Sequence, residues 1–171
     1  MNNNISVVLL GAGNSRRFKS HEIKQNILIN KISILNHSRL FFNKYFSKSN
    51  TFIVTNKKVK INKLSSNENI IYGSSSRLKS LYIALENIFK NNLQTKYTLI
   101  HDVARPILNI DDIKRLVASM KPGVDASTLG YPLTNALKGV KKNKVYSNYY
   151  RDEVWSSFTP QIFKTIKLYE S

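Results

Sequence analysis

The chain has 171 residues, 42% of them hydrophobic, which fits a single globular domain with a core of its own. It carries 27 Lys and Arg against 10 Asp and Glu, and the resulting formal charge of +17 suggests a polyanionic partner or a general bias toward Lys, Asn and Ile. Disulfides and thiolate metal sites are excluded because there is no cysteine, and the lack of a long apolar run or a basic leader segment predicts a cytoplasmic protein without a membrane span.

The first predicted element is a buried strand at residues 5–10, which ends in the glycine turn Gly11-Ala12-Gly13. Small residues let a backbone turn sharply and approach a ligand, and N–H groups exposed at such a turn bind anions. Four cations follow shortly after the turn, and they are Arg16, Arg17, Lys19 and Lys24. This order favours a polyphosphate ligand. On spacing alone, an ordinary turn beside a solvated basic loop has about the same weight.

Helices and strands alternate along the next hundred residues. We expect helices at residues 32–46, 76–90 and 110–120, with Ser33 capping the first and Asn109 or Asp111 the third. We expect strands at residues 51–55, 69–72, 97–100 and 126–131, and a surface connection at residues 57–69. Polar residues gather just after the strand ends. This is typical of an α/β sheet with a ligand crevice at the carboxyl edge of its strands.

Residues 132–150 interrupt this alternation. They have no helical pattern, and a Lys-Lys-Asn-Lys centre at residues 141–144 separates two flanks of high β-propensity. This pattern predicts a protruding β-hairpin with residues 141–144 at its turn. No linker or repeat follows, so the sequence predicts a single domain.

Four segments, in this order, carry a resemblance to a known family. They are residues 9–25 (LLGAGNSRRFKSHEIKQ), 72–80 (YGSSSRLKS), 100–106 (IHDVARP) and 151–163 (RDEVWSSFTPQIF). Together they resemble the 2-C-methyl-D-erythritol 4-phosphate cytidylyltransferases of the non-mevalonate isoprenoid pathway, over essentially all of residues 1–171. The resemblance implies an α/β fold with a Rossmann-like nucleotidyltransferase sheet, mostly parallel. It also implies that a β-hairpin arm at about residues 132–153 builds a homodimer.

The implied reaction joins CTP and methylerythritol phosphate to give the CDP-alcohol and pyrophosphate, with Mg²⁺ or another divalent cation as cofactor. Negative charge grows on the α-phosphate and on the departing pyrophosphate. Catalysis therefore needs positioning and electrostatic stabilisation more than a covalent nucleophile. The resemblance assigns that stabilisation to Arg17 and Lys24 as the catalytic pair.

The resemblance also assigns the binding residues. The nucleotide would be lined by Leu10, Gly11, Ala12, Gly13, Ser15 and Val103. Its cytosine would be read by Ser74, Ser75, Arg77 and Ser80, and Asp102 would lie near the ribose, the metal or the substrate. Methylerythritol phosphate would be held by Arg105, by Thr159 and by Arg151 from the dimer partner's arm. Asp102 is the candidate metal ligand, directly or through phosphate or water. His101 is expected to be structural, and Trp155 and Phe158 are expected to be packing residues.

Three features depart from the family pattern. Asn135 and Ala136 stand where an Asp-Thr pair is usual, and Ser74 replaces a glycine. The chain also ends soon after the Thr-Pro-Gln motif, so we expect the C-terminal part of the family domain, including a lysine that grips the substrate phosphate, to be missing.

Three alternatives therefore stay open beside the main interpretation. They are a ribitol-5-phosphate cytidylyltransferase, a degenerate or fragmentary nucleotide binder without turnover, and a nucleic-acid-binding module driven by the positive charge. The last is the least favoured, because the charge is spread along the chain and no helix-turn-helix, zinc finger or RNA-stacking strand occurs.

Overall fold

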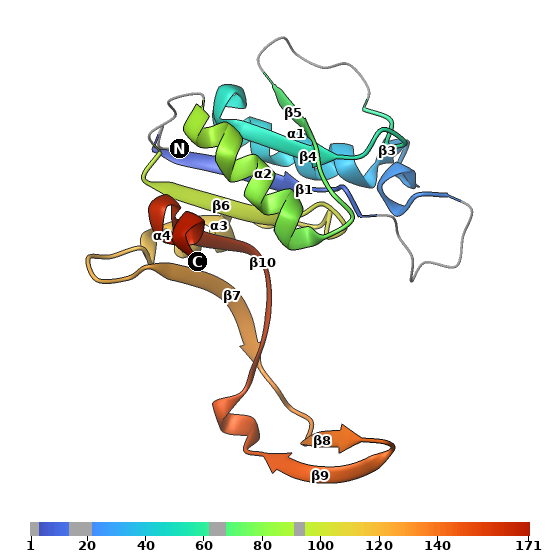
Figure 1. Cartoon of the computed structure of the whole chain (residues 1–171), viewed down its shortest axis with the longest axis vertical. Coiled ribbons are helices and arrows are strands. Elements are labelled where there is room, and N and C mark those ends of the chain that lie inside the picture. Colours follow the sequence, from blue (N-terminus) through green and yellow to red (C-terminus); the bar gives the residue numbers. More distant parts are fainter. Residues whose placement is uncertain (1–3, 14–21, 62–67, 91–94) are drawn as a thin grey trace.

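The computed structural model describes residues 4–13, 22–61, 68–90 and 95–171. Its centre is a six-stranded sheet in the order β5-β4-β1-β6-β10-β7 (Figure 1). The parallel strands are β1 (Ile5–Leu10), β4 (Thr51–Thr55), β5 (Asn69–Tyr72) and β6 (Tyr97–Asp102). β10 (Trp155–Lys164) runs antiparallel between β6 and β7 (Ala126–Pro132). The predicted mixed α/β class and mostly parallel sheet are confirmed.

Helices cover both faces of this sheet. The long ones are α1 (Ile34–Tyr45), α2 (Arg77–Lys90) and α3 (Ile110–Ala118), and α4 (Thr165–Glu170) ends the chain. Because successive side chains of a strand point to opposite faces, β1 supplies Val7 and Leu9 to the core that contains α1 and α3. It supplies Val8 to the core that contains α2. A sheet buried on both faces explains why its central strands read as continuous apolar runs.

The predicted helix boundaries are correct to within one or two residues. Ser33 accepts a hydrogen bond from the backbone N–H of Asn36 and caps α1, and Asn109 does the same for α3 through Asp111. Residues 32 and 33, expected within the first helix, instead form β3 (Ile32–Ser33), which pairs with β2 (Leu28–Ile29). Three short 3-10 helices complete the described elements: η1 (Lys24–Asn26), η2 (Lys48–Asn50) and η3 (Arg151–Glu153).

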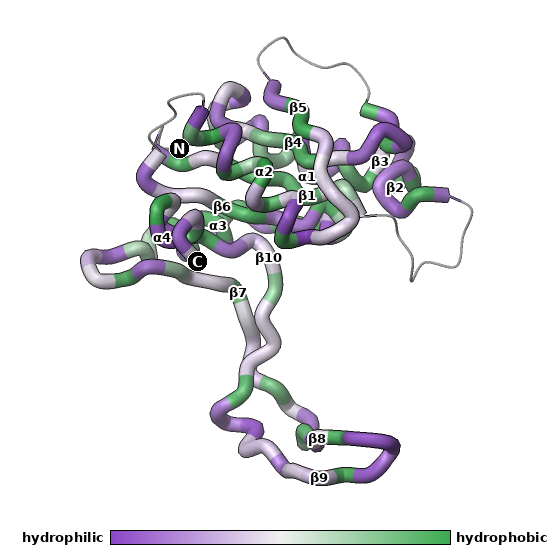
Figure 2. Tube along the Cα trace, viewed as in Figure 1, coloured by the Kyte–Doolittle hydropathy of each residue, from purple (hydrophilic) through white to green (hydrophobic). Residues whose placement is uncertain are grey.

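The predicted hairpin projects from the body of the molecule as an arm (Figure 1). It consists of β8 (Leu137–Lys141) and β9 (Lys144–Tyr149), and its two turn residues, Lys142 and Asn143, both have positive φ. Such a pair is typical of a two-residue type I′ turn. The hydrophobic residues gather in the central strands and the helix faces against them, whereas the turn of the arm is hydrophilic (Figure 2).

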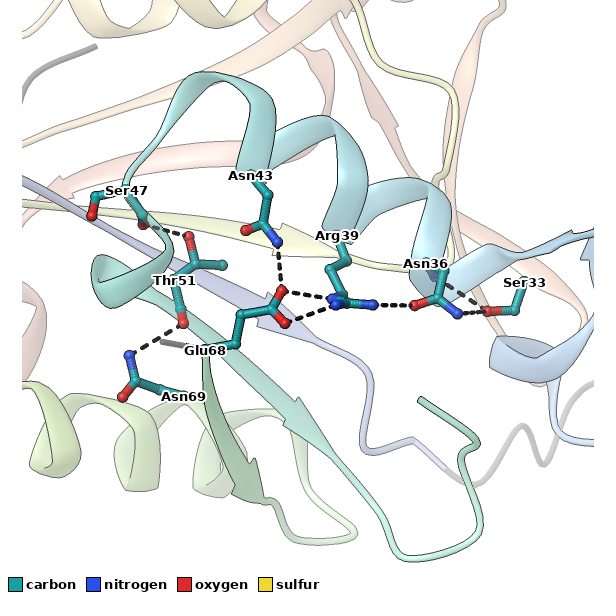
Figure 3. Close-up of polar contacts among 8 residues, drawn as sticks. All are labelled: Ser33, Asn36, Arg39, Asn43, Ser47, Thr51, Glu68 and Asn69. Carbon is teal, nitrogen blue, oxygen red and sulfur yellow. Dashed lines mark hydrogen bonds and ion pairs between the residues drawn. The ribbon is translucent and has the colours of Figure 1, made fainter. Parts of the chain in front are cut away.

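A buried ion pair ties α1 to the residue before β5. Arg39 binds Glu68 through two parallel hydrogen bonds, Nε to Oε1 at 2.6 Å and Nη2 to Oε2 at 2.7 Å. Asn43 donates to the same carboxylate, and Asn36 accepts from Arg39 Nη1 at 3.0 Å (Figure 3). The Glu68 side chain is fully buried, so these donors replace the water that the carboxylate gives up on folding.

One expectation at the base of the arm needs revision, and one strand there was not predicted. Trp155, expected to pack, is 61% exposed at the start of β10. β10 itself was not expected as a strand.

Within the described part of the chain, none of the helices has the length and apolar character needed to cross a membrane.

Candidate nucleotide-binding site

The carboxyl ends of β1, β4, β5 and β6 meet at one edge of the sheet, since these four strands are parallel. Hydrogen bonds join the residues that follow them. The N–H of Gly11 donates to Val54 O at 2.7 Å, that of Gly73 to Thr55 O at 2.9 Å and that of Val103 to Leu10 O at 3.1 Å. These hydrogen bonds join the glycine turn, the serine segment (residues 73–80) and the Asp102 loop (residues 102–106), which lie far apart in sequence, into one continuous rim.

The glycine turn is held from behind by two side-chain amides. Gln25 Nε2 donates to Gly11 O and to Gly13 O, both at 2.8 Å. Asn56 Nδ2 donates to Ala12 O at 3.2 Å. All three carbonyls of the turn are thus satisfied, and neither Ala12 N–H nor Gly13 N–H donates a hydrogen bond to a described residue. Two such N–H groups side by side are suited to bind an anion.

The serine segment packs against this turn at Gly73. A Cβ built on Gly73 would lie 2.6 Å from Ala12 Cβ and 2.8 Å from both Ser80 Oγ and Val54 Cγ1, so only glycine fits here. Ser80 is 3% exposed, and its hydroxyl accepts from Ser74 N at 2.9 Å and donates to Ser74 O at 3.1 Å. Ser80 therefore fixes the backbone of the segment that was expected to read the base.

Asp102 lies at the end of β6 and connects three parts of the site. Its carboxylate accepts from Arg77 Nε at 3.0 Å, at the first turn of α2. Its backbone N–H donates to Thr159 Oγ1 at 3.1 Å. The structure thus brings together three predicted site residues, Arg77, Asp102 and Thr159, from α2, β6 and β10.

A pocket of about 310 Å³ lies between the start of α3 and the strands β7 and β10, and Thr159, which accepts from the Asp102 N–H, is part of its wall. Arg105 and Thr159, two of the three residues expected to hold the alcohol substrate, both line it. Leu129, Tyr131 and Phe158 also line it. Phe158, expected to pack, contacts Tyr131 with ring centroids 6.1 Å apart.

His101 lies fully buried beneath the loop that follows β6. Its Nε2 is 3.1 Å from Arg105 O, its Nδ1 has no hydrogen-bond partner among the described residues, and its ring packs on Phe42. Burial lowers the pKa of His101 from its ordinary value to about 4, although the Arg105 carbonyl partly opposes the change. The neutral ring is held inside the core, so the geometry supports a structural role in shaping the loop that carries Arg105.

The remaining predicted residues have different placements. Ser15 and Arg17, with Arg16 and Lys19, lie outside the described residues. Lys24 begins η1, immediately before Gln25. Leu10 and Val103 have buried side chains in the two cores, so they shape the rim with their backbones. Arg151 lies on η3 of the arm and does not line the pocket of its own chain.

The residues present fit Mg²⁺ only in part. Within the described ranges, no three of His, Asp and Glu are close enough together to hold a metal ion. Asp102 supplies one carboxylate at the rim. Because Mg²⁺ is usually held by one or two carboxylates together with substrate phosphates and water, this set fits a metal bound mainly through the nucleotide.

Comparison with known proteins identifies the family. The family model described as 2-C-methyl-D-erythritol 4-phosphate cytidylyltransferase (IspD) matches residues 5–171. The chain belongs to this family. The prediction of a cytidylyltransferase from the four motifs is thereby confirmed, and neither the ribitol-5-phosphate enzyme nor a non-catalytic binder is favoured.

Individual relatives agree with the family model. The enzyme of that name from Wigglesworthia glossinidia brevipalpis is 30% identical over 164 residues, which is 93% of this chain and 70% of the relative. The bifunctional enzyme IspD/IspF of Pelagibacter ubique is 33% identical and matches 98% of this chain, which spans 45% of that protein. The crystal structure of the Francisella tularensis enzyme superposes with a TM-score of 0.78 at 27% identity, over 98% of this chain and 75% of that one.

Two residues that carry the glycine turn, Gln25 and Asn56, were not predicted as site residues. Gln25 is adjacent to Lys24 in the sequence, but nothing in the spacing shows that its side chain turns back to the glycines. Asn56 follows a predicted strand, and a polar residue at a strand end was the only available signal.

Proposed function

We propose that this chain transfers the cytidylyl group of CTP to 2-C-methyl-D-erythritol 4-phosphate and releases pyrophosphate. The observation that carries the proposal is the joining of the glycine turn, the Ser74–Ser80 contact and Asp102 at one rim, directly beside a pocket lined by Arg105 and Thr159. A nucleotide on the rim would present its α-phosphate toward that pocket.

The phosphate oxygen of the alcohol substrate attacks the α-phosphorus of CTP, and the bond between that phosphorus and the bridging oxygen of pyrophosphate breaks. The N–H groups of Ala12 and Gly13 would bind the phosphates. Lys24, with Arg17, would stabilise the charge that grows as the bond breaks. Arg105 and Thr159 would hold the alcohol phosphate in line, so that most of the rate gain comes from positioning and fixed charge.

Ser80 supports the choice of cytosine. A hydroxyl has one proton and two lone pairs, and Ser74 takes the proton and one lone pair. Only an acceptor remains for a ligand. The exocyclic amino group of cytosine can donate to it, whereas the corresponding oxygen of uracil cannot, so CTP should be preferred over UTP.

Asp102 and the nucleotide phosphates would hold Mg²⁺, which when bound would neutralise part of the phosphate charge. Arg77 fixes the position of the Asp102 carboxylate, and Thr159 fixes its backbone. Among the described residues, the contribution to the metal would therefore be the one oriented carboxylate of Asp102.

The arm supports a homodimer in which Arg151 acts on the partner's site. The arm projects from the body, and it exposes several apolar and aromatic side chains that water alone would surround in a monomer, namely Val140, Val145, Tyr146, Tyr149 and Tyr150. Arg151 is also well exposed, and its neighbour Asp152 is its only ion-pair partner among the described residues.

Mutation of Lys24 tests the catalytic assignment. Lys24→Ala should lower kcat by about 10²–10³-fold, because a cation that acts on the transition state is removed, while CTP affinity falls only modestly. Stopped assays of pyrophosphate release and calorimetric titration with CTP separate the two. A variant with the normal rate would contradict the role of Lys24.

Subunit mixing tests the action of Arg151 across the dimer. Lys24→Ala and Arg151→Ala proteins, each strongly impaired alone, should regain activity when mixed and allowed to exchange subunits. The mixed dimer has one site with an intact Lys24 and an intact Arg151 from the partner's arm. No recovery from a verified mixed dimer would contradict the shared site.

Two further expectations from the sequence stay predictions. The first is a cytoplasmic location, which cell fractionation tests. The second is that the +17 charge reflects composition and not nucleic-acid binding. Salt-titrated RNA and DNA binding tests the second, because phosphate-driven binding weakens steeply as salt rises.

A further inference from the structure

We propose that Gln25 is a positioning residue for catalysis, which orients the N–H groups of the glycine turn toward the phosphates and fixes Lys24 beside them. This inference rests on the proposed function for the identity of the ligand. It assigns a role to a side chain that touches neither substrate.

Two hydrogen bonds from Gln25 to the glycine turn use both protons of one amide nitrogen. Nε2 donates to Gly11 O and to Gly13 O, each at 2.8 Å, and the residue is 6% exposed. Because these hydrogen bonds run from one buried group to the first and third carbonyls of the turn, they fix both the position of the turn and the orientation of its peptide planes. The contact joins η1 to the turn across 12 and 14 residues of sequence.

The direction of a carbonyl decides the direction of the next N–H. A trans peptide is planar, so its C=O and N–H point in opposite directions. Because Gln25 draws the Gly11 carbonyl to one side, the Ala12 N–H points to the other. Asn56 does the same for the Gly13 N–H by binding the Ala12 carbonyl at 3.2 Å.

Both N–H groups are thereby left without a described partner and held in place before any ligand arrives. Such preorganisation matters for catalysis, because donors that are already oriented need no rearrangement as charge develops. Without the two amides, the flexible Gly-Ala-Gly backbone could rotate its peptide planes and turn carbonyl oxygens toward the phosphates.

Gln25 also fixes the position of Lys24. The two residues of η1 that follow Lys24 are both anchored by their side chains. Gln25 binds the glycine turn, while Asn26 donates to Lys58 O at 3.2 Å and accepts from Lys60 N at 3.0 Å. Lys24 therefore starts from a segment that cannot shift without breaking the contact to the phosphate-binding turn.

The test compares ligands with and without phosphate. Calorimetric titrations of the full chain with CTP and with cytidine would be run for the wild type, Gln25→Glu and Gln25→Met. Both substitutions keep the side-chain length and remove the donor. CTP affinity should fall about 10–100-fold, from the loss of two hydrogen bonds, while cytidine affinity stays within about threefold.

Asn36→Ala is the matched control. Asn36 is equally buried, at 6% exposure, and donates one amide hydrogen bond to Ser33 Oγ at 2.8 Å, but its contacts belong to the Arg39 network. It should lower the melting temperature and leave the ratio of CTP to cytidine affinity unchanged.

If the Gln25 variants do not fold, Asn56→Ala is the second test variant, because Asn56 is only half-buried. It should lower the same ratio about threefold or more. Folded variants that keep the wild-type ratio, or that weaken CTP and cytidine equally, would overturn the positioning role. A folded wild type that does not bind CTP would instead contradict the proposed function.

Discussion

Gly73→Ala is the substitution that most directly probes how the base-reading segment is joined to the glycine turn. The added Cβ would lie 2.6 Å from Ala12 Cβ and 2.8 Å from Ser80 Oγ and Val54 Cγ1. Non-bonded carbon atoms are comfortable at about 3.5–4.0 Å, so the overlap is roughly 1 Å.

The neighbours cannot relieve this overlap without cost. Ala12 has no side-chain torsion, Val54 is fully buried in β4, and turning the Ser80 hydroxyl away would break its two hydrogen bonds to Ser74. The ends of β1 and β5 would have to separate, which strains the hydrogen bond from Gly73 N to Thr55 O. Overpacking of this kind costs about 1–3 kcal/mol, and a domain of this size should then melt about 2–12 °C lower.

The assay is thermal unfolding of Gly73→Ala beside Gly13→Ala, followed by CTP titration. No atom of the described residues lies within 4 Å of a Cβ built on Gly13, and its φ is not positive. The Gly13 variant should therefore keep its stability or gain up to about 1 kcal/mol through the unfolded state. Gly73→Ala should be less stable and bind CTP more weakly. Equal stability of the two variants would refute the tight joint between turn and segment.

Two further predictions concern buried charge and pH. Glu68→Gln should lower the free energy of unfolding by about 3–5 kcal/mol, because it leaves the buried Arg39 without its carboxylate, while turnover per folded molecule stays unchanged. The double variant with Arg39→Met should recover part of that loss in chemical denaturation, and a single variant as stable as the wild type would contradict the account. In the folded protein the pKa of His101 is about 4, so the ring stays neutral above that pH, whereas in the unfolded chain it takes up a proton below about pH 6.5. As the pH drops from 6.5 to 4, the free energy of unfolding should therefore fall by about 3 kcal/mol more in the wild type than in His101→Gln. Above pH 6.5, this group should not affect the pH dependence of stability in either protein. Parallel pH profiles of the two proteins would contradict the burial of a neutral ring.

The sequence was sufficient for the elements whose pattern is local. β4 and β5 have the predicted bounds, and Ser33 caps α1 as expected. β10 was missed because Pro160 stands in its middle and proline usually breaks a central strand. The structure accommodates it with a register shift between Phe158 and Gln161, which only pairing with β7 reveals.

For the candidate site, too, the sequence predicted some features and missed others. The motifs pointed to Asp102 and Ser80, which lie at a strand end and a helix start that the sequence indicates. Thr159 followed only from the resemblance, because it lies inside β10, a strand that the sequence did not indicate. The motifs did not show that Ser80 binds Ser74, or that Gln25 and Asn56 support the glycine turn. Such contacts depend on which way an amide or hydroxyl turns after folding, and spacing carries no information about that.

The proposed reaction is tested most directly by pyrophosphate release from CTP with methylerythritol phosphate and with ribitol phosphate as rival acceptors, using folded protein and Mg²⁺. The structure-based account predicts release that depends on methylerythritol phosphate and is lost in Lys24→Ala. Release with ribitol phosphate alone, or no release with either acceptor from protein that binds CTP, would contradict it.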